Sequence, residues 1–398
     1  MERENAVMVR IGELWLKSEQ VKKQFMVSLG YNIRAALNAE NIEYKIKGYR
    51  DRVLIYGEVE RIATVVSRVF GIVDVSICIT CGNSPEEIAA AAISIAKRKL
   101  RSGMRFAVRA RRQHVNGFTS QELARIVADV VWEKVSHFVV DLDDPEYEVF
   151  VEAREYGGIV YDSRIQGPGG LPLGTGGRAL ILLSAGIDSP VAAWLMMRRG
   201  IIVSGVFMDG GRWAGTATKD LALDNARILS TWSSGRDISL WVVNMESFFE
   251  KMTTSKYRHY TCIFCKRFMM RAANVLASYG RFDALVSGEN LGQVASQTIK
   301  NMRVITASVK IPILRPLLTY NKEEIIAISK KIGTFHESPG DTRCRATPRK
   351  PATQSTTELI EKWEESMDLD LAEMIENACT SAELWIARNG TIFRKSIK

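Results

Sequence analysis

The chain is 398 residues long and basic, with 54 Lys and Arg against 45 Asp and Glu. The length exceeds what one hydrophobic core usually serves, so we expect roughly two to four domains. A hydrophobic content of 46% with 25% charged residues is that of a globular protein and excludes a disordered or membrane chain. No apolar run reaches the roughly 18 residues of a membrane span and residues 1–13 lack a signal-peptide core, so we expect a cytoplasmic protein without a membrane partner.

Residues 1–74 are predicted to form a small α+β domain. Strand patterns cover residues 6–14 and 44–59, and helix patterns cover residues 18–39 and 61–70. In the first helix, apolar residues recur every four positions and form one stripe. That stripe would pack against one face of the strands.

Residues 75–165 are predicted to form a second α/β unit. After a strand that ends in the sequence CITC, Pro85 opens an alanine-rich helix, a basic strand follows, and Thr119 with Glu122 forms a capping box before another helix. A final strand over residues 147–162 completes the unit. The first part of the chain therefore holds two α/β units.

The basic strand RFAVRARR, residues 105–112, lies in a window with no acidic residue between Glu87 and Glu122. Alternate residues of a strand point to the same face, so the arginines form a row while Phe106 and Val108 face the other way. Such a row suits a phosphate backbone, although a solvated basic surface without a ligand is the alternative. The candidate nucleic-acid contacts are Lys97, Arg98, Arg105, Arg109, Arg111 and Arg112.

Residues 166–178, QGPGGLPLGTGGR, are the densest Gly and Pro cluster and are expected to form a linker. Over residues 179–398, strand and helix patterns alternate. This alternation predicts a doubly wound parallel sheet, whose ligand site lies beyond the carboxyl ends of the strands. The acidic tail over residues 357–384 is expected to be helical.

The first strand of this region, ALILL, is followed at once by Ser184, Gly186, Asp188 and Ser189 and then by an amphipathic helix. A tight turn from a buried strand into a helix leaves backbone N–H groups aimed at one point, where the helix dipole adds positive potential. Small residues let the backbone approach an oxyanion, Ser189 adds a hydroxyl donor, and Asp188 can hold the cation that accompanies phosphates. Neither GxxxxGK[ST] nor GxGxxG is present at this turn, and a plain glycine-containing turn is the alternative.

The turn SAGIDSP resembles the SGGxDS pyrophosphate loop of the ATP pyrophosphatases, with Ala185 in place of the first glycine. Together with GELWLKSEQVKKQF, RFAVRARR, FTSQEL, LPLGTGGRALILL, GENLGQVASQT and RPLLTYNKEEIIAISKKIGTF, it makes the chain similar to the ThiI family of tRNA 4-thiouridine synthetases over residues 8–354. The resemblance implies an α/β multidomain chain: an N-terminal ferredoxin-like α+β domain, a THUMP α/β domain that binds tRNA, and a PP-loop ATP pyrophosphatase domain. It implies ATP-dependent sulfur transfer to C4 of uridine 8 in tRNA. Another tRNA thiolation, such as 2-thiolation, or sulfur supply for thiamine thiazole is the alternative.

The resemblance also places the ATP pocket. Adenylation of the C4 oxygen would turn a poor leaving group into a good one, so the nucleotide and RNA sites belong to one mechanism. Backbone at the strand ends can read adenine, Lys266 or Arg267 can meet a phosphate, and Asp188 is the expected catalytic residue and Mg²⁺ partner. The candidate ATP contacts are Leu182, Leu183, Ser184, Gly186, Asp188, Ser189, Val206, Phe207, Lys266, Arg267, Gly288 and Gln297.

The sulfur carrier is expected among the six cysteines, because the chain ends too early to hold the rhodanese domain that bacterial members often append. The resemblance groups Cys262 and Cys265 of CIFC with Cys344, three thiolates that can hold a 4Fe-4S cluster with one iron open to an exogenous sulfide. Alternatives are a persulfide on Cys344 resolved by Cys262 or Cys265, and a zinc site built from CIFC and CITC. Cys379 is expected to pack in the tail. The sulfur donor and a homodimer are left open.

Overall fold

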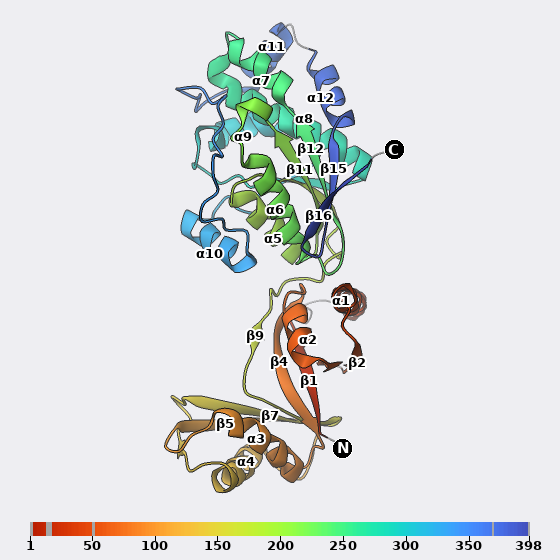
Figure 1. The fold of residues 1–398 in the computed structure, drawn as a ribbon, viewed down its shortest axis with the longest axis vertical. Helices are drawn as coiled ribbons and strands as arrows, with labels where there is room; N and C mark the ends of the chain where they lie inside the picture. Colours follow the sequence, from red (N-terminus) through yellow and green to blue (C-terminus); the bar gives the residue numbers. More distant parts are fainter. Residues whose placement is uncertain (1–2, 13–17, 50–51, 368–369, 397–398) are drawn as a thin grey trace. The chain divides into compact units, whose positions relative to one another are not determined.

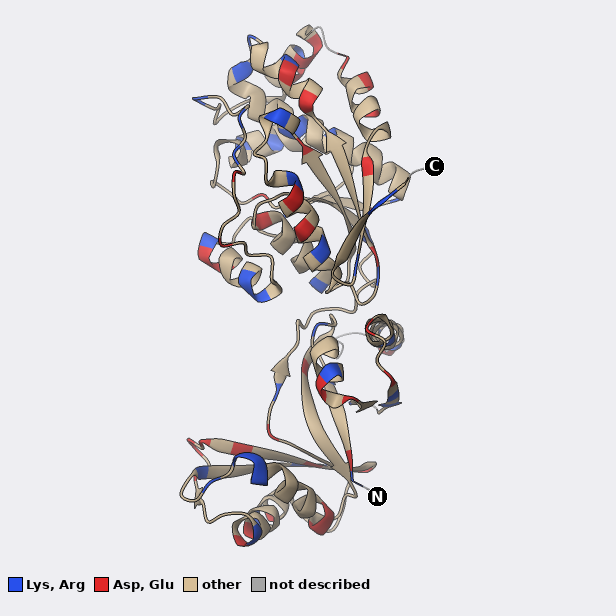
Figure 2. Ribbon diagram, viewed as in Figure 1, with Lys and Arg blue, Asp and Glu red and all other residues tan. Residues whose placement is uncertain are grey.

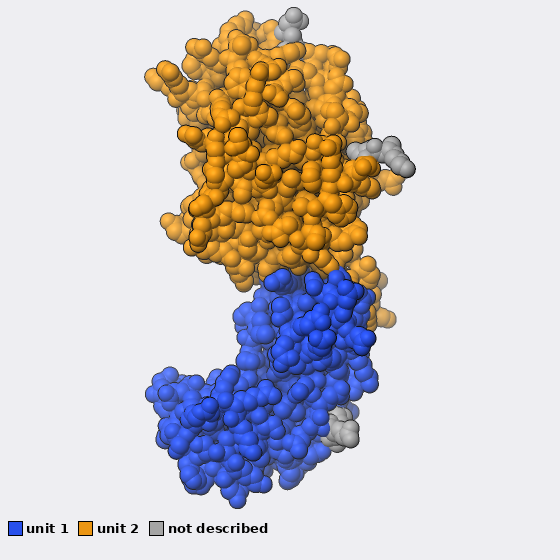
Figure 3. All heavy atoms as spheres, in the orientation of Figure 1, with its two compact units in different colours: residues 1–17, 36–170 blue, residues 18–35, 171–398 orange. Residues whose placement is uncertain are grey.

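The computed structural model describes residues 3–12, 18–49, 52–367 and 370–396. They form two compact units (Figures 1 and 3): unit 1 comprises residues 1–17 and 36–170, and unit 2 comprises residues 18–35 and 171–398. The change from unit 1 to unit 2 after Gly170 falls inside the Gly- and Pro-rich segment. Among the described helices, none is both long and apolar enough to cross a membrane.

Unit 1 is built on one mixed sheet, in the order β2-β3-β1-β4-β8-β7-β5-β6, with β9 also pairing with β4. The central strand β4 pairs with β1 on one side and with β8 on the other, and it crosses the position where the sequence suggested a boundary between two domains. The two α/β units therefore share one sheet. The strands are β1 (Glu4–Ile11), β2 (Tyr44–Gly48), β3 (Val53–Gly57), β4 (Ile72–Cys81), β5 (Arg105–Gln113), β6 (Val139–Val140), β7 (Tyr147–Arg154), β8 (Gly157–Tyr161) and β9 (Ile165–Gln166).

The single strand predicted over residues 44–59 is wrong. β2 and β3 form an antiparallel hairpin in which Tyr44 lies opposite Gly57, and the backbone N–H of Tyr49 donates to the Arg52 carbonyl at 2.8 Å. The chain reverses direction between Tyr49 and Arg52, and residues 50–51 lie outside the described residues. Residues 13–17 of the motif GELWLKSEQVKKQF also lie outside them.

The helices of unit 1 are α2 (Val59–Val66), α3 (Pro85–Lys99) and α4 (Ser120–Lys134), and α1 (Glu19–Ala39) falls largely in unit 2. The predicted capping box of α4 is confirmed: the Thr119 hydroxyl accepts from the Glu122 backbone, and the Glu122 carboxylate accepts from the Thr119 backbone. Both α3 and α4 pack on the face of the sheet that carries the alternate residues Val149, Val151 and Ala153 of β7.

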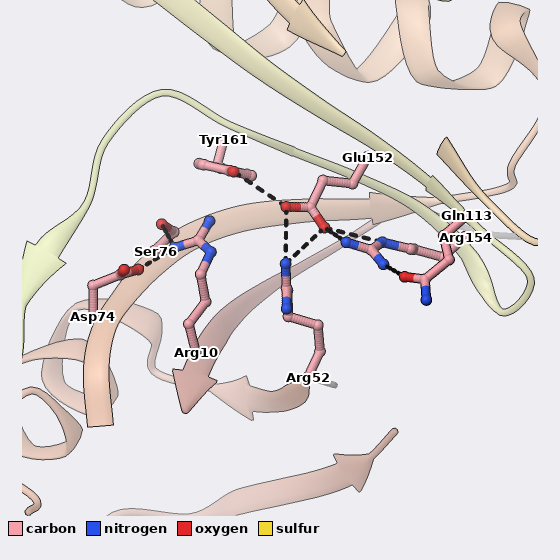
Figure 4. Close-up of polar contacts among 8 residues, drawn as sticks. All are labelled: Arg10, Arg52, Asp74, Ser76, Gln113, Glu152, Arg154 and Tyr161. Carbon is pink, nitrogen blue, oxygen red and sulfur yellow. Dashed lines mark hydrogen bonds and ion pairs between the residues drawn. The ribbon is translucent and has the colours of Figure 1, made fainter. Parts of the chain in front are cut away.

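The opposite face of β7 carries a buried charge network around Glu152 (Figure 4). Glu152 is only 1% exposed. Its carboxylate accepts from Arg154 Nε at 3.0 Å, from the Tyr161 hydroxyl at 3.2 Å and from Arg52 Nη2 at 3.4 Å. Burial alone would raise the pKa of Glu152, but the charges of Arg52 and Arg154 hold it below its usual value. Arg154 also bonds Gln113, so the network reaches the end of β5.

Unit 2 contains a doubly wound sheet in the order β14-β13-β10-β11-β12-β15-β16. The strands from β14 to β12 are parallel, as the sequence predicts. Helices α5 and α6 pack together on one face, and α8 with α12 packs on the other (Figure 1). The strands are β10 (Arg178–Leu182), β11 (Ile202–Asp209), β12 (Ile238–Asn244), β13 (Ala284–Val286), β14 (Ile313–Leu314), β15 (Glu383–Arg388) and β16 (Thr391–Lys395).

The C-terminal tail is helical only in part. The prediction is right for α11 (Thr357–Ser366) and α12 (Leu371–Thr380), with residues 368–369 outside the described residues. It is wrong at Glu383 and Leu384, which belong to β15; β15 and β16 add an antiparallel hairpin to β12. Asn389 and Gly390 adopt φ values of 44° and 77° at the tip, the left-handed geometry that a tight hairpin turn requires. The other helices are α5 (Asp188–Arg198), α6 (Thr218–Ser230), α7 (Glu246–Thr254), α8 (Thr261–Gly280), α9 (Ile299–Thr306) and α10 (Lys322–Ile332).

Candidate active site

The turn from β10 into α5 is held by its own hydroxyl groups. The Ser184 backbone N–H donates to the Ser189 hydroxyl at 2.8 Å, and the two serine hydroxyls lie 2.9 Å apart. Gly288, which follows β13, lies directly against this turn: a Cβ there would come within 2.7 Å of the Ser189 backbone nitrogen. Only glycine therefore allows the two strand ends to approach this closely.

A cavity of about 220 Å³ opens at this point, where the carboxyl ends of β10 and β13 meet α5 and α8. It lies where a doubly wound sheet is expected to bind its ligand. Seven of the predicted ATP contacts line it: Leu182, Ser184, Asp188, Ser189, Lys266, Gly288 and Gln297. Met269, Met270, Ser287 and Glu289 complete the lining.

The remaining predicted ATP contacts do not line this cavity. Leu183, Val206 and Phe207 are buried in the sheet, and the Leu183 backbone N–H donates to the Val206 carbonyl at 2.9 Å. Any contact of these residues with a nucleotide would therefore come through the ends of β10 and β11. Gly186 is in the turn itself, where its N–H donates to the Ser184 hydroxyl at 3.3 Å.

Lys266 and Arg267 are neighbours in α8 but face different surroundings. Lys266 lines the cavity, whereas the Arg267 side chain is 0% exposed. Arg267 donates from Nε and Nη2 to the two carboxylate oxygens of Glu364, both at 2.8 Å, and from Nη1 to the Val304 carbonyl at 2.7 Å. These bonds give Arg267 a structural position, so Lys266 is the cation of the pair that faces the cavity.

The two carboxylates of the cavity are Asp188 and Glu289, and sequence reasoning missed Glu289 together with two cations that hold these carboxylates, Lys322 and Arg315. Lys322, at the start of α10, donates to Asp188 Oδ1 at 2.9 Å. Glu289 accepts from Lys266 Nζ at 2.8 Å and from Arg315 Nε at 2.7 Å. Burial alone would raise the pKa of Glu289, but these two cations lower it. The motifs GENLGQVASQT and RPLLTYNKEE contain all three missed residues, so the signal lay in motifs already singled out.

Cys262 and Cys265 lie in the first turn of α8, immediately before Lys266. Burial, and then the proximity of Cys344, raises the pKa of both thiols above the usual value. Cys344 itself is exposed on the segment between α10 and α11. Within the described ranges, no three His, Cys, Asp or Glu side chains are arranged to hold a metal ion.

The zinc alternative is not supported by the position of Cys78 and Cys81 in β4. They are three positions apart in a strand, so they point to opposite faces of the sheet and pack in different hydrophobic clusters. Burial raises the pKa of Cys78 to about 12 and that of Cys81 to about 11. Cys379 is also buried, and its thiol donates to the Ala272 carbonyl at 3.5 Å.

In unit 1, a groove of about 720 Å³ lies beside β5 and includes Arg109 and Arg111. Arg109 donates to Glu148 at 2.6 Å and Arg105 forms ion pairs with nearby carboxylates, whereas Arg111 and Arg112 are exposed. Lys97 and Arg98 are exposed in the last turn of α3. Arg125 and Arg164 also line the groove, and sequence reasoning missed both.

Comparison with known proteins identifies the family. The chain is 36% identical over 390 residues to a Methanosarcina mazei protein named "Probable tRNA sulfurtransferase", covering 96% of this chain and 95% of that protein. It is 34% identical over 385 residues to a Staphylococcus aureus protein of the same name, covering 95% and 93% of the two chains. The chain belongs to the tRNA sulfurtransferase family. It is therefore an enzyme of the sulfurtransferase class.

Two of the family models match the part of the sulfurtransferase chain that forms the first sheet, and the third matches most of the part that forms the second sheet. The "ThiI ferredoxin-like domain" matches residues 6–76, the "THUMP domain" residues 82–161, and "Thiamine biosynthesis protein (ThiI)" residues 174–369. A 4-thiouridine synthetase solved in complex with RNA and with bound ATP has a TM-score of 0.86 at 29% identity, covering 97% of this chain and 100% of that chain. A Pyrococcus horikoshii protein, PH1313, has a TM-score of 0.64 at 25% identity, covering 83% and 99%.

Proposed function

We propose that this chain makes 4-thiouridine at position 8 of tRNA, as an ATP-dependent tRNA uracil 4-sulfurtransferase of the cytoplasm. The observation that carries the proposal is the adjacency of Cys265 and Lys266: the lysine lines the cavity beside the serine-rich turn, and the cysteine precedes it in the same helical turn. Nucleotide chemistry and sulfur chemistry can thus meet at one end of α8. The ATP and RNA bound to the similar 4-thiouridine synthetase support this reading.

The reaction has two substitutions. The C4 oxygen of uracil attacks the α-phosphorus of ATP, and the bond from that phosphorus to the bridging oxygen breaks, so pyrophosphate leaves with the electron pair. A sulfur nucleophile then attacks C4, and AMP leaves with the former C4 oxygen. With sulfide as the nucleophile, one proton is released and no oxidant or reductant is needed.

The residues of the cavity suit the first substitution. The N–H groups of the turn and the hydroxyls of Ser184 and Ser189 would bind the pyrophosphate part of ATP. Lys266 and Lys322 would neutralise phosphate charge as pyrophosphate departs. Asp188, which is only partly exposed and already paired with a cation, fits the carboxylate partner of Mg²⁺. When bound, Mg²⁺ would supply further charge neutralisation at the phosphates.

The second substitution requires a sulfur carrier, for which we propose Cys262, Cys265 and Cys344 with a 4Fe-4S cluster. The donor set fits, because all three are thiols and the segment that follows Cys344 is hydrogen-bonded to the residues before Cys262, from the Ala352 N–H to the His259 carbonyl at 3.1 Å. Cys344 would have to move towards the pair in α8, since the three sulfurs are not gathered as a metal site. When bound by three thiolates, such a cluster would offer an open position for a sulfur nucleophile.

A persulfide on Cys344 is the second candidate, favoured by the exposure of this cysteine. Its terminal sulfur would attack C4, and Cys262 or Cys265 would then break the sulfur–sulfur bond to leave a disulfide on the enzyme. That disulfide needs an external dithiol to be reduced before the next turnover. A sulfur supply for thiazole synthesis is a further candidate, favoured by the thiamine biosynthesis description of the matching family model.

We further propose that tRNA contacts the basic strand β5 of unit 1, which falls in the segment that the THUMP model matches. Residues 75–165 would then serve RNA binding and residues 179–398 adenylation and sulfur transfer. The sulfur donor is proposed to be sulfide or a persulfide carrier. A homodimer is compatible with this division of tasks.

The test is thiolation by the purified protein, with nucleoside mass spectrometry of tRNA as the readout. Anaerobically reconstituted protein with ATP, Mg²⁺ and sulfide is expected to form 4-thiouridine and one AMP per product. Cys262→Ser, Cys265→Ser and Cys344→Ser should lose activity and iron, because a hydroxyl holds iron poorly. Cys78→Ala and Cys379→Ala are the controls and should keep both. Formation of 2-thiouridine, or of no thionucleoside, would contradict the proposed function, and full activity without iron would reject the cluster alone.

A further inference from the structure

The segments of unit 2 that hold the three proposed sulfur-carrying cysteines are devoid of acidic residues. Residues 251–282, which include Cys262 and Cys265, contain no Asp or Glu, and neither do residues 342–357, which include Cys344. In the latter segment Arg343, Arg345, Arg349 and Lys350 fall within eight positions. Figure 2 shows Lys and Arg positions in blue along the path between α10 and α11. Within these two segments, every residue with a permanent charge is therefore a cation.

The segment around Cys344 is fixed to the body of unit 2 by Arg345. The Arg345 backbone N–H donates to the Trp213 carbonyl at 2.7 Å, and its guanidinium donates to the Ala214 carbonyl at 2.9 Å and to Asp341 at 2.9 Å. Gly215 makes the approach possible, because a Cβ there would lie 2.1 Å from the Asp341 carbonyl oxygen. Arg345 is thus a structural anchor, and the basic residues beside it are held on an ordered backbone.

Further along, the same segment is joined to the short helix η3 (Arg258–Tyr260) that precedes Cys262. The Ala352 backbone N–H donates to the His259 carbonyl at 3.1 Å. Arg258, Arg349 and Lys350 are exposed and form no ion pair with any described residue. Arg343 is paired only loosely, at 3.3 Å from Asp341, with 89% of its side chain exposed. We call Arg258, Arg343, Arg349 and Lys350 the cysteine-side surface.

We propose that the cysteine-side surface binds backbone phosphates of the RNA substrate and so brings the target nucleotide to Cys344. This inference rests on the proposed function and assigns a second RNA contact, within unit 2, apart from β5. Three of the four cations form no ion pair with a described residue, and Arg343 is 89% exposed, so their charge stays available for phosphate. Each phosphate contact releases counterions. Arginine is also suited to phosphate because its guanidinium can donate two parallel hydrogen bonds.

The competing explanation is that these cations only attract ATP or balance the charge of thiolates. In the proposed function, ATP has cations of its own: Lys266, which lines the cavity, and Lys322, which pairs with the cavity residue Asp188. None of the four residues of the cysteine-side surface lines that cavity. If these cations only balanced the charge of the cysteine thiolates, they would have to lie close to the sulfur atoms, and their removal would leave RNA affinity unchanged. The two explanations therefore differ in which ligand loses affinity when the cations are removed.

The experiment compares two triple variants of the full chain. The test variant is Arg258→Ala, Arg349→Ala and Lys350→Ala. The control is Lys310→Ala, Lys330→Ala and Lys331→Ala, which removes the same charge from other exposed positions of unit 2. tRNA binding is measured over a range of salt concentrations. We expect the slope of log Kd against log salt to fall by about one for each lost phosphate contact in the test variant and to stay near wild type in the control.

ATP affinity is measured in the same two variants and should stay within about twofold of wild type, because the cavity is intact. Equal slopes in the two triple variants would overturn the proposal, as would a loss confined to ATP affinity. These binding measurements do not require turnover, so they remain decisive even if the chain proves to thiolate another position.

A second measurement uses the wild-type chain and does not depend on any variant. A tRNA carrying 4-thiouridine at position 8 is irradiated with long-wave ultraviolet light in the complex, and the crosslinked peptide is sequenced. Crosslinks within residues 251–262 or 342–357 would support the proposal. Crosslinks confined to other parts of the chain would overturn the delivery of the nucleotide to Cys344, whereas failure of the wild type to make 4-thiouridine would count against the proposed function only.

Discussion

Lys322 Nζ lies 2.9 Å from Asp188 Oδ1, although 134 residues separate the two in the chain. The pair joins the first residue of α5 to the first residue of α10 at the wall of the cavity that we propose for ATP. Both side chains are partly exposed, at 26% for Asp188 and 44% for Lys322. An ion pair this exposed adds little stability, so its place beside the phosphate turn points to a role with the nucleotide.

Asp188→Ala is expected to lower tRNA-dependent AMP formation by about 10²-fold or more, because it removes the proposed Mg²⁺ partner and frees Lys322. The free energy of unfolding should change by less than about 1 kcal/mol, as for other exposed pairs. AMP release and urea denaturation measure the two effects. Lys331→Met is the control and should leave AMP formation unchanged, because Lys331 is on the same helix as Lys322, α10, but at its other end. Wild-type AMP formation by Asp188→Ala at saturating Mg²⁺ would reject the assignment.

Glu289→Gln gives a test in which two explanations predict opposite signs. If Glu289 only repels phosphate, its neutralisation should tighten ATP binding. We expect the opposite, because the carboxylate holds Lys266 and Arg315 at 2.8 and 2.7 Å and these cations would repel each other without it. The dissociation constant for ATP should rise by about tenfold, because Lys266 would no longer be held where it can pair with a phosphate. The dissociation constant for adenosine should change little, because adenosine has no phosphate. Calorimetric titration with ATP and with adenosine measures both dissociation constants. Tighter ATP binding by Glu289→Gln would show that Glu289 does not position Lys266 and Arg315 for the phosphates.

Glu364→Gln should act on stability. The Arg267 side chain is fully buried and bonded to Glu364 through two nitrogens. Removing the carboxylate charge leaves this cation paired only with the more exposed Glu361, 3.5 Å away, and should cost up to about 3–5 kcal/mol of unfolding free energy. Burial alone would raise the pKa of Glu364, but Arg267 and Arg271 lower it. A lowered folded-state pKa means that this stabilisation is present at neutral pH and lost as the pH falls below the usual carboxyl range near about 4.

Urea denaturation at several pH values checks this expectation. The wild type should lose more stability than Glu364→Gln between neutral pH and the acid range, so the two curves should converge as the pH falls. Parallel curves would show that Glu364 does not supply the ionised partner of Arg267. ATP affinity serves as the internal control and should be retained in the folded variant, because Glu364 does not line the cavity.

Local patterns in the sequence located the parts of the site that are contiguous in the chain. The turn at Ser184 and the capping box of α4 follow from residue type and spacing alone, and both lie where the patterns put them. Local patterns could not show whether Lys266 or Arg267 faces the cavity. Successive residues of a helix point in different directions, and the surroundings of each direction depend on distant elements such as α9 and α11.

The partners of Asp188 and Glu289 escaped prediction for the same reason. Lys322 and Arg315 reach the cavity only after β13, β14 and α10 have packed in order. The C-terminal hairpin was missed because an acidic helical pattern was extended past its end. The Asn389–Gly390 dipeptide between the apolar runs ELWIAR and TIFRK was the signal that could have corrected it.

Arg111→Ala should weaken tRNA binding more than Arg109→Ala, although the two arginines are alternate residues of the same strand. Arg109 is already neutralised by Glu148 at 2.6 Å and also donates to the Leu142 carbonyl at 2.7 Å, whereas Arg111 is exposed. A cation with a protein partner has less charge to offer a phosphate and must break an existing pair to do so. We expect Arg111→Ala to reduce the slope of log Kd against log salt by about one, and Arg109→Ala by clearly less.

Filter binding of tRNA at increasing salt concentrations measures both slopes. ATP affinity is the control and should be unchanged in each variant, because Arg109 and Arg111 belong to unit 1 and the cavity belongs to unit 2. Glu148→Gln provides a matched partner experiment. It frees Arg109 without removing a cation, so it should strengthen tRNA binding and steepen the slope. If Arg109→Ala and Arg111→Ala reduce the slope equally, the ion pair with Glu148 does not persist in the complex. If neither changes it, β5 is a solvated basic strand and tRNA binds elsewhere.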